Sequence, residues 1–142
     1  MKIKEYSIRE MVIEDYDEVY QLWSLTKGIG LSGADTRENI DAYLRRNKDL
    51  SFVCEKSNRI IGAILCGHDG RRGFIHHLVI DEEYRRIGLA KKLVSKSLER
   101  LKQENIQKCH LFVMKDNELG KEFWVKTNWV QREDIGVFSK NL

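Results

Sequence analysis

One pairing of segments constrains the fold of this 142-residue chain more than any other feature. Residues 74–80 (FIHHLVI) form a nearly continuous run of apolar residues and histidines, as expected of a central strand covered on both faces. From Gly88 to Glu104, apolar residues recur at helical spacing, and lysine and glutamate occupy the opposite face. A buried strand that leads into a long amphipathic helix predicts an α/β fold with helices packed on a sheet.

The remaining patterns supply the other elements of that fold. The expected elements are a strand at 2–9, helices at 13–25 and 37–46, strands at 51–55 and 59–66 joined by a hairpin, the strand at 74–80, the helix at 88–104, a strand at 109–114, a helix at 117–127 and short closing strands within 130–139. This order, β-α-α-β-β-β-α-β-α-β, predicts a mixed α/β sheet with helices on both faces. The length and the absence of repeats or linkers predict a single domain over residues 1–142.

Composition and charge exclude several classes of protein. The chain is 42% hydrophobic and 33% charged, which is ordinary for a globular protein. It has no apolar run near the ~20 residues of a membrane-spanning helix and no signal-type N-terminus, so we expect a cytoplasmic protein that does not bind membranes. The net charge of +3 comes from interspersed residues, so nucleic-acid binding is not expected.

The cysteine pattern favours buried thiols. Cys54, Cys66 and Cys109 are widely spaced, odd in number and without a CxxC pair. Reduced thiols are therefore expected rather than disulfides or a metal site.

The junction between the central strand and the long helix has the properties of an anion site. A helix start leaves about four backbone N–H groups unpaired, and the helix dipole attracts an anion there. Gly88 and Ala90 have little or no side chain, so a pyrophosphate can approach the backbone. Arg85, Arg86 and Lys91 add positive charge. The residues predict a polyphosphate site that is neither a Walker A loop nor a Rossmann fingerprint, and the alternative is a plain loop entering a surface helix.

Four segments carry a resemblance to the GCN5-related N-acetyltransferase (GNAT) superfamily. They are Ile60-Ile61-Gly62, the strand His76–Ile80, the loop Arg85–Ala90, and Asn117-x-x-Gly120-x-x-Phe123-Trp124. The chain resembles small bacterial members of this superfamily over nearly its whole length. The resemblance implies an N-acetyltransferase that uses acetyl-coenzyme A, needs no metal, and transfers the acetyl group directly to a primary amine in a ternary complex. The implied acceptor is a small molecule or a protein N-terminus, and the implied protein is a monomer or a homodimer.

The resemblance also assigns roles to residues. Backbone N–H groups from Arg86 to Ala90 hold the pyrophosphate, and the strand end pairs with the pantetheine arm as an added strand would. The Leu78 N–H polarises the acetyl carbonyl as an oxyanion donor. Asn117 binds the pantetheine. The full set of implied coenzyme-binding residues is Leu78, Val79, Ile80, Arg85, Arg86, Ile87, Gly88, Leu89, Ala90, Lys91, Asn117, Gly120 and Phe123.

Two catalytic groups common in this superfamily are missing. Trp124 stands where a tyrosine is often proposed to protonate the leaving thiolate, and an indole N–H does not release a proton at neutral pH. A thiolate with a reference pKa of ~8.5 can take its proton from water, and core packing is the other role for Trp124. Phe74 and Phe112 stand where a glutamate base is sought.

His76 is the catalytic candidate that remains. Strand alternation places it on the same face as Phe74 and Leu78, with His77 on the opposite face. Its reference pKa of ~6.5 suits a general base, and the alternative is a core histidine. The missing groups keep a second function open, a coenzyme A binding regulatory module without catalysis.

Two further segments have open roles. His68 and Asp69 lie in the turn GHDGRRG and form either a polar hairpin tip or a rim contact to substrate. Tyr20, Trp23 and the loop 27–35 occupy the region that shapes the acceptor pocket in the superfamily, and they predict no particular acceptor.

Overall fold

The computed structural model describes residues 5–142, and the chain divides into two compact units, residues 1–112 and 113–142. Each unit is described by itself. The strand expected at 2–9 lies partly outside the described residues, and within them β1 spans Ser7–Glu10.

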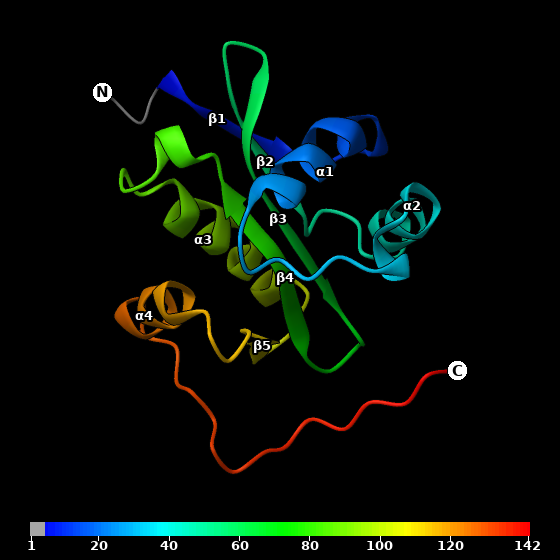
Figure 1. Cartoon of the computed structure of the whole chain (residues 1–142). Coiled ribbons are helices and arrows are strands. Elements are labelled where there is room, and N and C mark those ends of the chain that lie inside the picture. The colour runs from blue at the N-terminus through cyan, green and yellow to red at the C-terminus, as the bar shows by residue number, and fades with distance from the viewer. Residues whose placement is uncertain (1–4) are drawn as a thin grey trace. The chain divides into compact units, whose positions relative to one another are not determined.

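The first unit is built on one five-stranded sheet with the strand order β1-β2-β3-β4-β5 (Figure 1). Strands β1 to β4 pair antiparallel in sequence order, and β5 pairs parallel to β4. The strands after β1 are β2 (Phe52–Lys56), β3 (Arg59–His68), β4 (Gly73–Ile80) and β5 (Cys109–Leu111). The helices are α1 (Tyr16–Leu25), α2 (Arg37–Arg46) and α3 (Leu89–Gln103), and short 3-10 turns precede them at Ile13–Asp15, Gly33–Asp35 and Glu82–Tyr84. The predicted mixed α/β sheet is confirmed.

Helices cover both faces of this sheet, as two neighbouring residues of β3 show. Ala63 belongs to a core cluster that includes Val19 of α1 and Ile40 of α2. Gly62 faces the other way, where Leu93 of α3 packs over it. Helices α1 and α2 therefore lie on one face and α3 lies on the other, as can be followed in Figure 1.

Local chemistry sets the hairpins. Ser57 and Asn58 join β2 to β3 with positive φ angles of 52° and 62°, the geometry of a two-residue turn between twisted strands. In the turn between β3 and β4, Asp69 Oδ1 accepts the backbone N–H groups of Arg71 and Arg72 at 2.8 Å each. His68 Nε2 lies 2.8 Å from Glu104 Oε1 just beyond α3. The side chains of His68 and Asp69 are thus engaged as a polar hairpin tip.

The second unit contains α4 (Glu118–Lys126) and no strand. The closing strands expected within 130–139 are therefore wrong. Val130, Val137 and Phe138 are 81%, 68% and 98% exposed, and the Arg132 and Asp134 side chains pair with each other at 2.8 Å. A strand needs a neighbouring strand to satisfy its backbone, and this unit supplies none.

We predict that Gly62→Ala destabilises the protein, because a Cβ there would lie 2.7 Å from Ile80 Cδ1 and 3.2 Å from the Val79 carbonyl oxygen. Overpacking of this kind costs about 1–3 kcal/mol of unfolding free energy, measurable by urea denaturation. Gly30→Ala is the matched control, since nothing lies within 4 Å of its added Cβ. Equal stability of the two variants would contradict the close packing of β3 against β4.

Candidate active site

Strand β4 contains a β-bulge at its centre. Leu65 of β3 pairs with His76, but Ala63 pairs with Val79, so two residues of β4 face one residue of β3. His77 has a positive φ of 49° at this point. A bulge of this kind inserts one residue, breaks the regular ladder and redirects side chains.

The bulge changes which face the histidines occupy. The His77 ring lies 4.9 Å from the ring of Trp23 on α1, measured between centroids, and His76 lies near Tyr43 of α2 and Phe74. Both histidines therefore face the α1 and α2 side of the sheet. The expectation that His77 points to the opposite face is wrong, because simple alternation fails where a residue is inserted.

The burial of His76 affects its protonation. Burial lowers the pKa of His76 below its ordinary value of 6.5, the neighbouring His77 lowers it further, and Asp35 opposes the shift. His76 is therefore neutral at pH 7. Its ring packs between aromatic rings, and no hydrogen bond to it occurs among residues 5–142.

Beyond the bulge, one edge of β4 has no strand beside it in the described part of the chain. Strand β5 pairs with β4 only at residues 73–75. The Asp81 N–H donates to the Ile61 carbonyl at 2.7 Å. Gly62 and Ile80, which lie opposite each other, are therefore a non-hydrogen-bonded pair of the antiparallel ladder. The backbone groups of Ile80 then point away from β3. Leu78 comes directly before the Val79–Ala63 pair and is one of the two residues of the bulge.

The loop after β4 joins this edge to the start of α3. Arg85 Nε donates to the Ile80 carbonyl oxygen at 2.9 Å. Arg86 and Gly88 have positive φ angles of 66° and 88°, and Gly88 is the N-terminal cap of α3 without a side-chain partner. The structure thus brings the predicted loop and the predicted strand edge together.

The start of α3 has the electrostatics of an anion site. The first helical bond of α3 after this cap runs from the Lys92 N–H to the Gly88 carbonyl at 3.1 Å. The N–H groups of residues 89–91 precede it and have no helical partner. No acidic residue lies in the first turn, and Lys91 and Lys92 do. The unpaired N–H groups, the helix dipole and the lysines all favour a bound anion.

The predicted coenzyme residues after position 112 belong to the second unit. Asn117 caps α4, where its Oδ1 accepts the Gly120 N–H at 2.9 Å. A Cβ at Gly120 would lie 2.6 Å from the Asn117 Nδ2, which explains a glycine at this position. Trp124 packs against Phe123 and Trp129 at centroid distances of 4.9 and 5.0 Å, so it has a packing role.

Asp35 is a site residue that the sequence analysis did not single out. Its Oδ1 lies 2.8 Å from His77 Nε2, and its side chain is only 8% exposed. Its Oδ2 accepts the Ser32 N–H at 3.0 Å, and its main-chain carbonyl accepts the Tyr16 hydroxyl at 2.6 Å. The sequence signal was the spacing Ser32-x-x-Asp35, a capping box before a helix, which indicates an ordered carboxylate in an otherwise glycine-rich loop.

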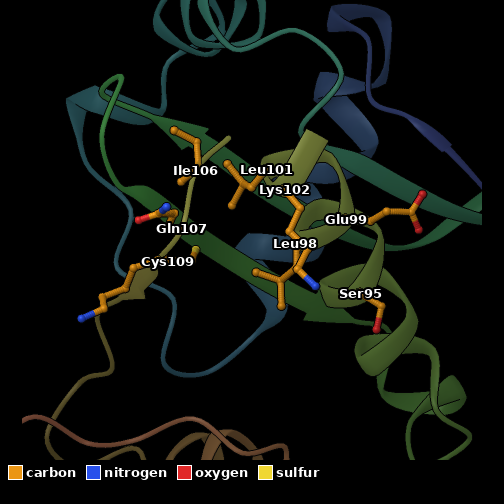
Figure 2. A pocket seen from close by; sticks show the side chains of 9 residues that line it. Ser95, Leu98, Glu99, Leu101, Lys102, Ile106, Gln107 and Cys109 are labelled. Atoms are coloured by element: carbon orange, nitrogen blue, oxygen red, sulfur yellow. The ribbon is translucent and has the colours of Figure 1, made fainter. Parts of the chain in front are cut away.

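A surface depression of about 510 Å³ lies elsewhere, along the second half of α3 (Figure 2). Its lining includes Leu98, Glu99 and Lys102 of α3 and the segment 106–109. None of the predicted site residues lines it. It is therefore separate from the bulge and the loop.

Among residues 5–142, no three His, Cys, Asp or Glu side chains are grouped so as to hold a metal ion. No helix in the same range is long and apolar enough to span a membrane.

Comparison with known proteins gives one family. The profile described as the acetyltransferase (GNAT) family matches residues 16–128. An acetyltransferase of Pectobacterium atrosepticum is 30% identical over 105 residues, which cover 74% of each chain. An acetyltransferase of Photorhabdus laumondii is 29% identical over 136 residues, which cover 95% of this chain and 94% of that one.

A solved structure shows the same fold. The PaiA N-acetyltransferase of Thermoplasma acidophilum, in complex with coenzyme A, matches with a TM-score of 0.79 at 20% identity. The match covers 92% of this chain and 93% of that one. With a family profile that spans most of the chain and a fold in agreement, this protein belongs to the acetyltransferase (GNAT) family and is an acyltransferase enzyme.

Proposed function

We propose that this protein transfers the acetyl group of acetyl-coenzyme A to a primary amine, directly and within a ternary complex. One observation carries the proposal. The open edge of β4 ends at Ile80, and Arg85 holds that end against the loop that starts α3. A polyphosphate on the loop and an extended arm along the edge then form one continuous binding path for this co-substrate.

The binding roles follow from that path. The pyrophosphate binds the N–H groups of Arg86 to Ala90, with Lys91 nearby, because these groups precede the helical ladder. The pantetheine arm lies along Leu78, Val79 and Ile80 as an added strand would. Asn117, Gly120 and Phe123 complete the proposed coenzyme set from α4.

The chemical roles lie at the bulge. The Leu78 N–H polarises the acetyl carbonyl and stabilises the oxyanion that forms on attack. His76 is neutral at pH 7 and is the sequence-based candidate for the base that deprotonates the amine. The leaving thiolate takes its proton from water, since Trp124 cannot supply one.

The cysteines support direct transfer over an acyl-cysteine intermediate. Burial raises the pKa of Cys54 to about 11. The hydrogen bond with the Cys109 thiol, together with burial, raises the pKa of Cys66, so neither thiol is a ready nucleophile at neutral pH. Cys109 lies beside Gly73 and Leu101, on the α3 side of the sheet, away from the histidines. An amine that reaches the bulge from the α1 side therefore attacks the thioester itself.

We also propose that residues 1–142 act as one catalytic domain. The family profile crosses the boundary between the two units at residue 112, which supports this proposal. The proposed acceptor is a small-molecule amine or a peptide N-terminus. The second candidate function is a coenzyme A binding module without catalysis, favoured by Trp124, whose ring packs against neighbours where a proton donor is expected.

For coenzyme binding, we predict that Gly88→Asp abolishes the thermal stabilisation given by acetyl-coenzyme A, because it adds a carboxylate where the pyrophosphate binds. Gly70→Asp is the matched control. Gly70 has a φ of 93°, close to the 88° of Gly88, and open space around it. Gly70→Asp therefore introduces the same backbone strain and the same added charge, but in the β3–β4 turn. Differential scanning fluorimetry with and without the co-substrate measures both. If acetyl-coenzyme A still stabilises Gly88→Asp, the loop does not bind the pyrophosphate.

For catalysis, we predict that at least one member of a panel of primary amines and peptides releases free coenzyme A thiol, measured with a thiol reagent. The rate should depend on the amine concentration and should be absent with tertiary amines, which cannot form a stable amide. Stabilisation by acetyl-coenzyme A without thiol release from any amine would favour the binding module.

A further inference from the structure

A buried ionisable pair joins the loop before α2 to the bulge of β4. Asp35 Oδ1 and His77 Nε2 lie 2.8 Å apart, and the two side chains are 8% and 16% exposed. Burying a carboxylate costs folding free energy unless hydrogen bonds or an opposite charge compensate it, so a carboxylate at this position indicates a structural or functional role for its partner. The pair lies on the same face of the sheet as α1, where the proposed acceptor enters.

Asp35 is held in place by contacts that do not involve the histidine. The Ser32 N–H donates to its Oδ2 at 3.0 Å, and the Tyr16 hydroxyl donates to its main-chain carbonyl at 2.6 Å. Its carboxylate is therefore pre-oriented before it meets His77. A group fixed in this way orients an imidazole and determines which nitrogen carries the proton.

The hydrogen bond defines the tautomer of His77. A carboxylate only accepts, so the Nε2 of His77 carries the proton and donates to Asp35. The Nδ1 then keeps its lone pair. Nδ1 is bonded to Cγ and is the ring nitrogen nearer the main chain, which at this point leads directly into Leu78. The free lone pair thus belongs to the residue next to the proposed oxyanion donor.

We propose that His77 is the general base of the acetyl transfer and that Asp35 is its positioning residue. The proposal rests on the proposed function and deepens it, since it assigns the proton acceptor of the same site. His76, the other candidate, has no hydrogen bond to orient its ring in the described residues and packs between Tyr43 and Phe74.

The reaction then balances. His77 Nδ1 takes one proton from the ammonium form of the acceptor and passes it to water. The free amine nitrogen forms a bond to the acetyl carbon, and the bond between that carbon and the thioester sulfur breaks with its electron pair on sulfur. The nitrogen loses a second proton, and the thiolate gains one from the solvent. The products are the amide, free coenzyme A and one proton.

The groups that face His77 come from three elements. Asp35 precedes α2, His76 is its neighbour on β4, and Tyr16 and Tyr20 flank Trp23 on α1. Burial and nearby negative groups raise the pKa of Tyr16, so it stays protonated. The indole N–H of Trp23 is buried without a partner in the described residues, although its ring packs on His77. Asp35 is thus the charged group in hydrogen-bonding contact with the proposed base.

The test compares His77→Gln with His76→Gln in the full chain, using an amine found to release thiol. A glutamine amide retains a donor for Asp35 but cannot accept a proton as a base. We expect His77→Gln to lower kcat/KM about 100-fold or more, the usual size of a general-base contribution. The Kd for acetyl-coenzyme A and the Tm should stay near the wild-type values. His76→Gln should lower kcat/KM much less.

Two readouts separate catalysis from a structural role. With acceptors of falling basicity, more of the amine is unprotonated at pH 7, so the deficit of His77→Gln should shrink. In Asp35→Asn the His77 ring loses its anionic hydrogen-bond acceptor, so kcat should fall while the KM for the acceptor and the Kd for acetyl-coenzyme A stay near the wild-type values.

Each contrary result has one meaning. Wild-type kcat/KM in His77→Gln, or a large loss in His76→Gln instead, overturns the assignment and leaves the proposed function standing. A loss in His77→Gln that is the same for every acceptor basicity shows that the residue is only structural. If the wild-type chain binds acetyl-coenzyme A and releases no thiol with any amine, the proposed function fails and the assignment fails with it.

Discussion

The inserted residue at the centre of β4 is the constraint on which the candidate site depends. A regular strand buried between two helical layers would place one histidine on each face and would continue its ladder on both sides. The bulge places His76 and His77 on one face. Beyond it, β4 runs to Ile80 without a strand on its second edge in the described residues. The same local irregularity thus gives both the histidine face and the open backbone edge.

Charge is distributed around this irregularity in two different ways. The loop after β4 and the start of α3 present unpaired N–H groups and lysines, which suit a negatively charged ligand. The Asp35–His77 pair is instead buried and hydrogen-bonded. A buried pair gains little stability over an apolar replacement, but it holds the two groups in one geometry. The loop after β4 is thus suited to bind a charged ligand, and the Asp35–His77 pair is suited to hold an imidazole in a fixed orientation.

Local patterns in the sequence predicted most of the elements correctly. The helix at 37–46 begins and ends as expected, and α3 differs by one residue at each end. These segments have strong periodicity and clear ends, such as Thr36, whose side chain accepts the Asn39 N–H at the start of α2. The strands expected within 130–139 failed, because apolar residues there predicted pairing without a partner strand in that unit. Strand formation depends on a neighbour that a local pattern does not contain.

By itself, the sequence determined the α/β class, the anion-binding loop around Gly88 and the list of histidines from which a base can come. These properties depend on composition and spacing over a few residues, so they can be predicted from local patterns. Only the tertiary structure decided which histidine meets Asp35, 42 positions away in the chain. That contact depends on the extra residue in β4, which reverses side-chain direction, and on the packing of the loop before α2 beside it. Neither depends on short-range spacing, because both arise from the pairing of β4 with β3.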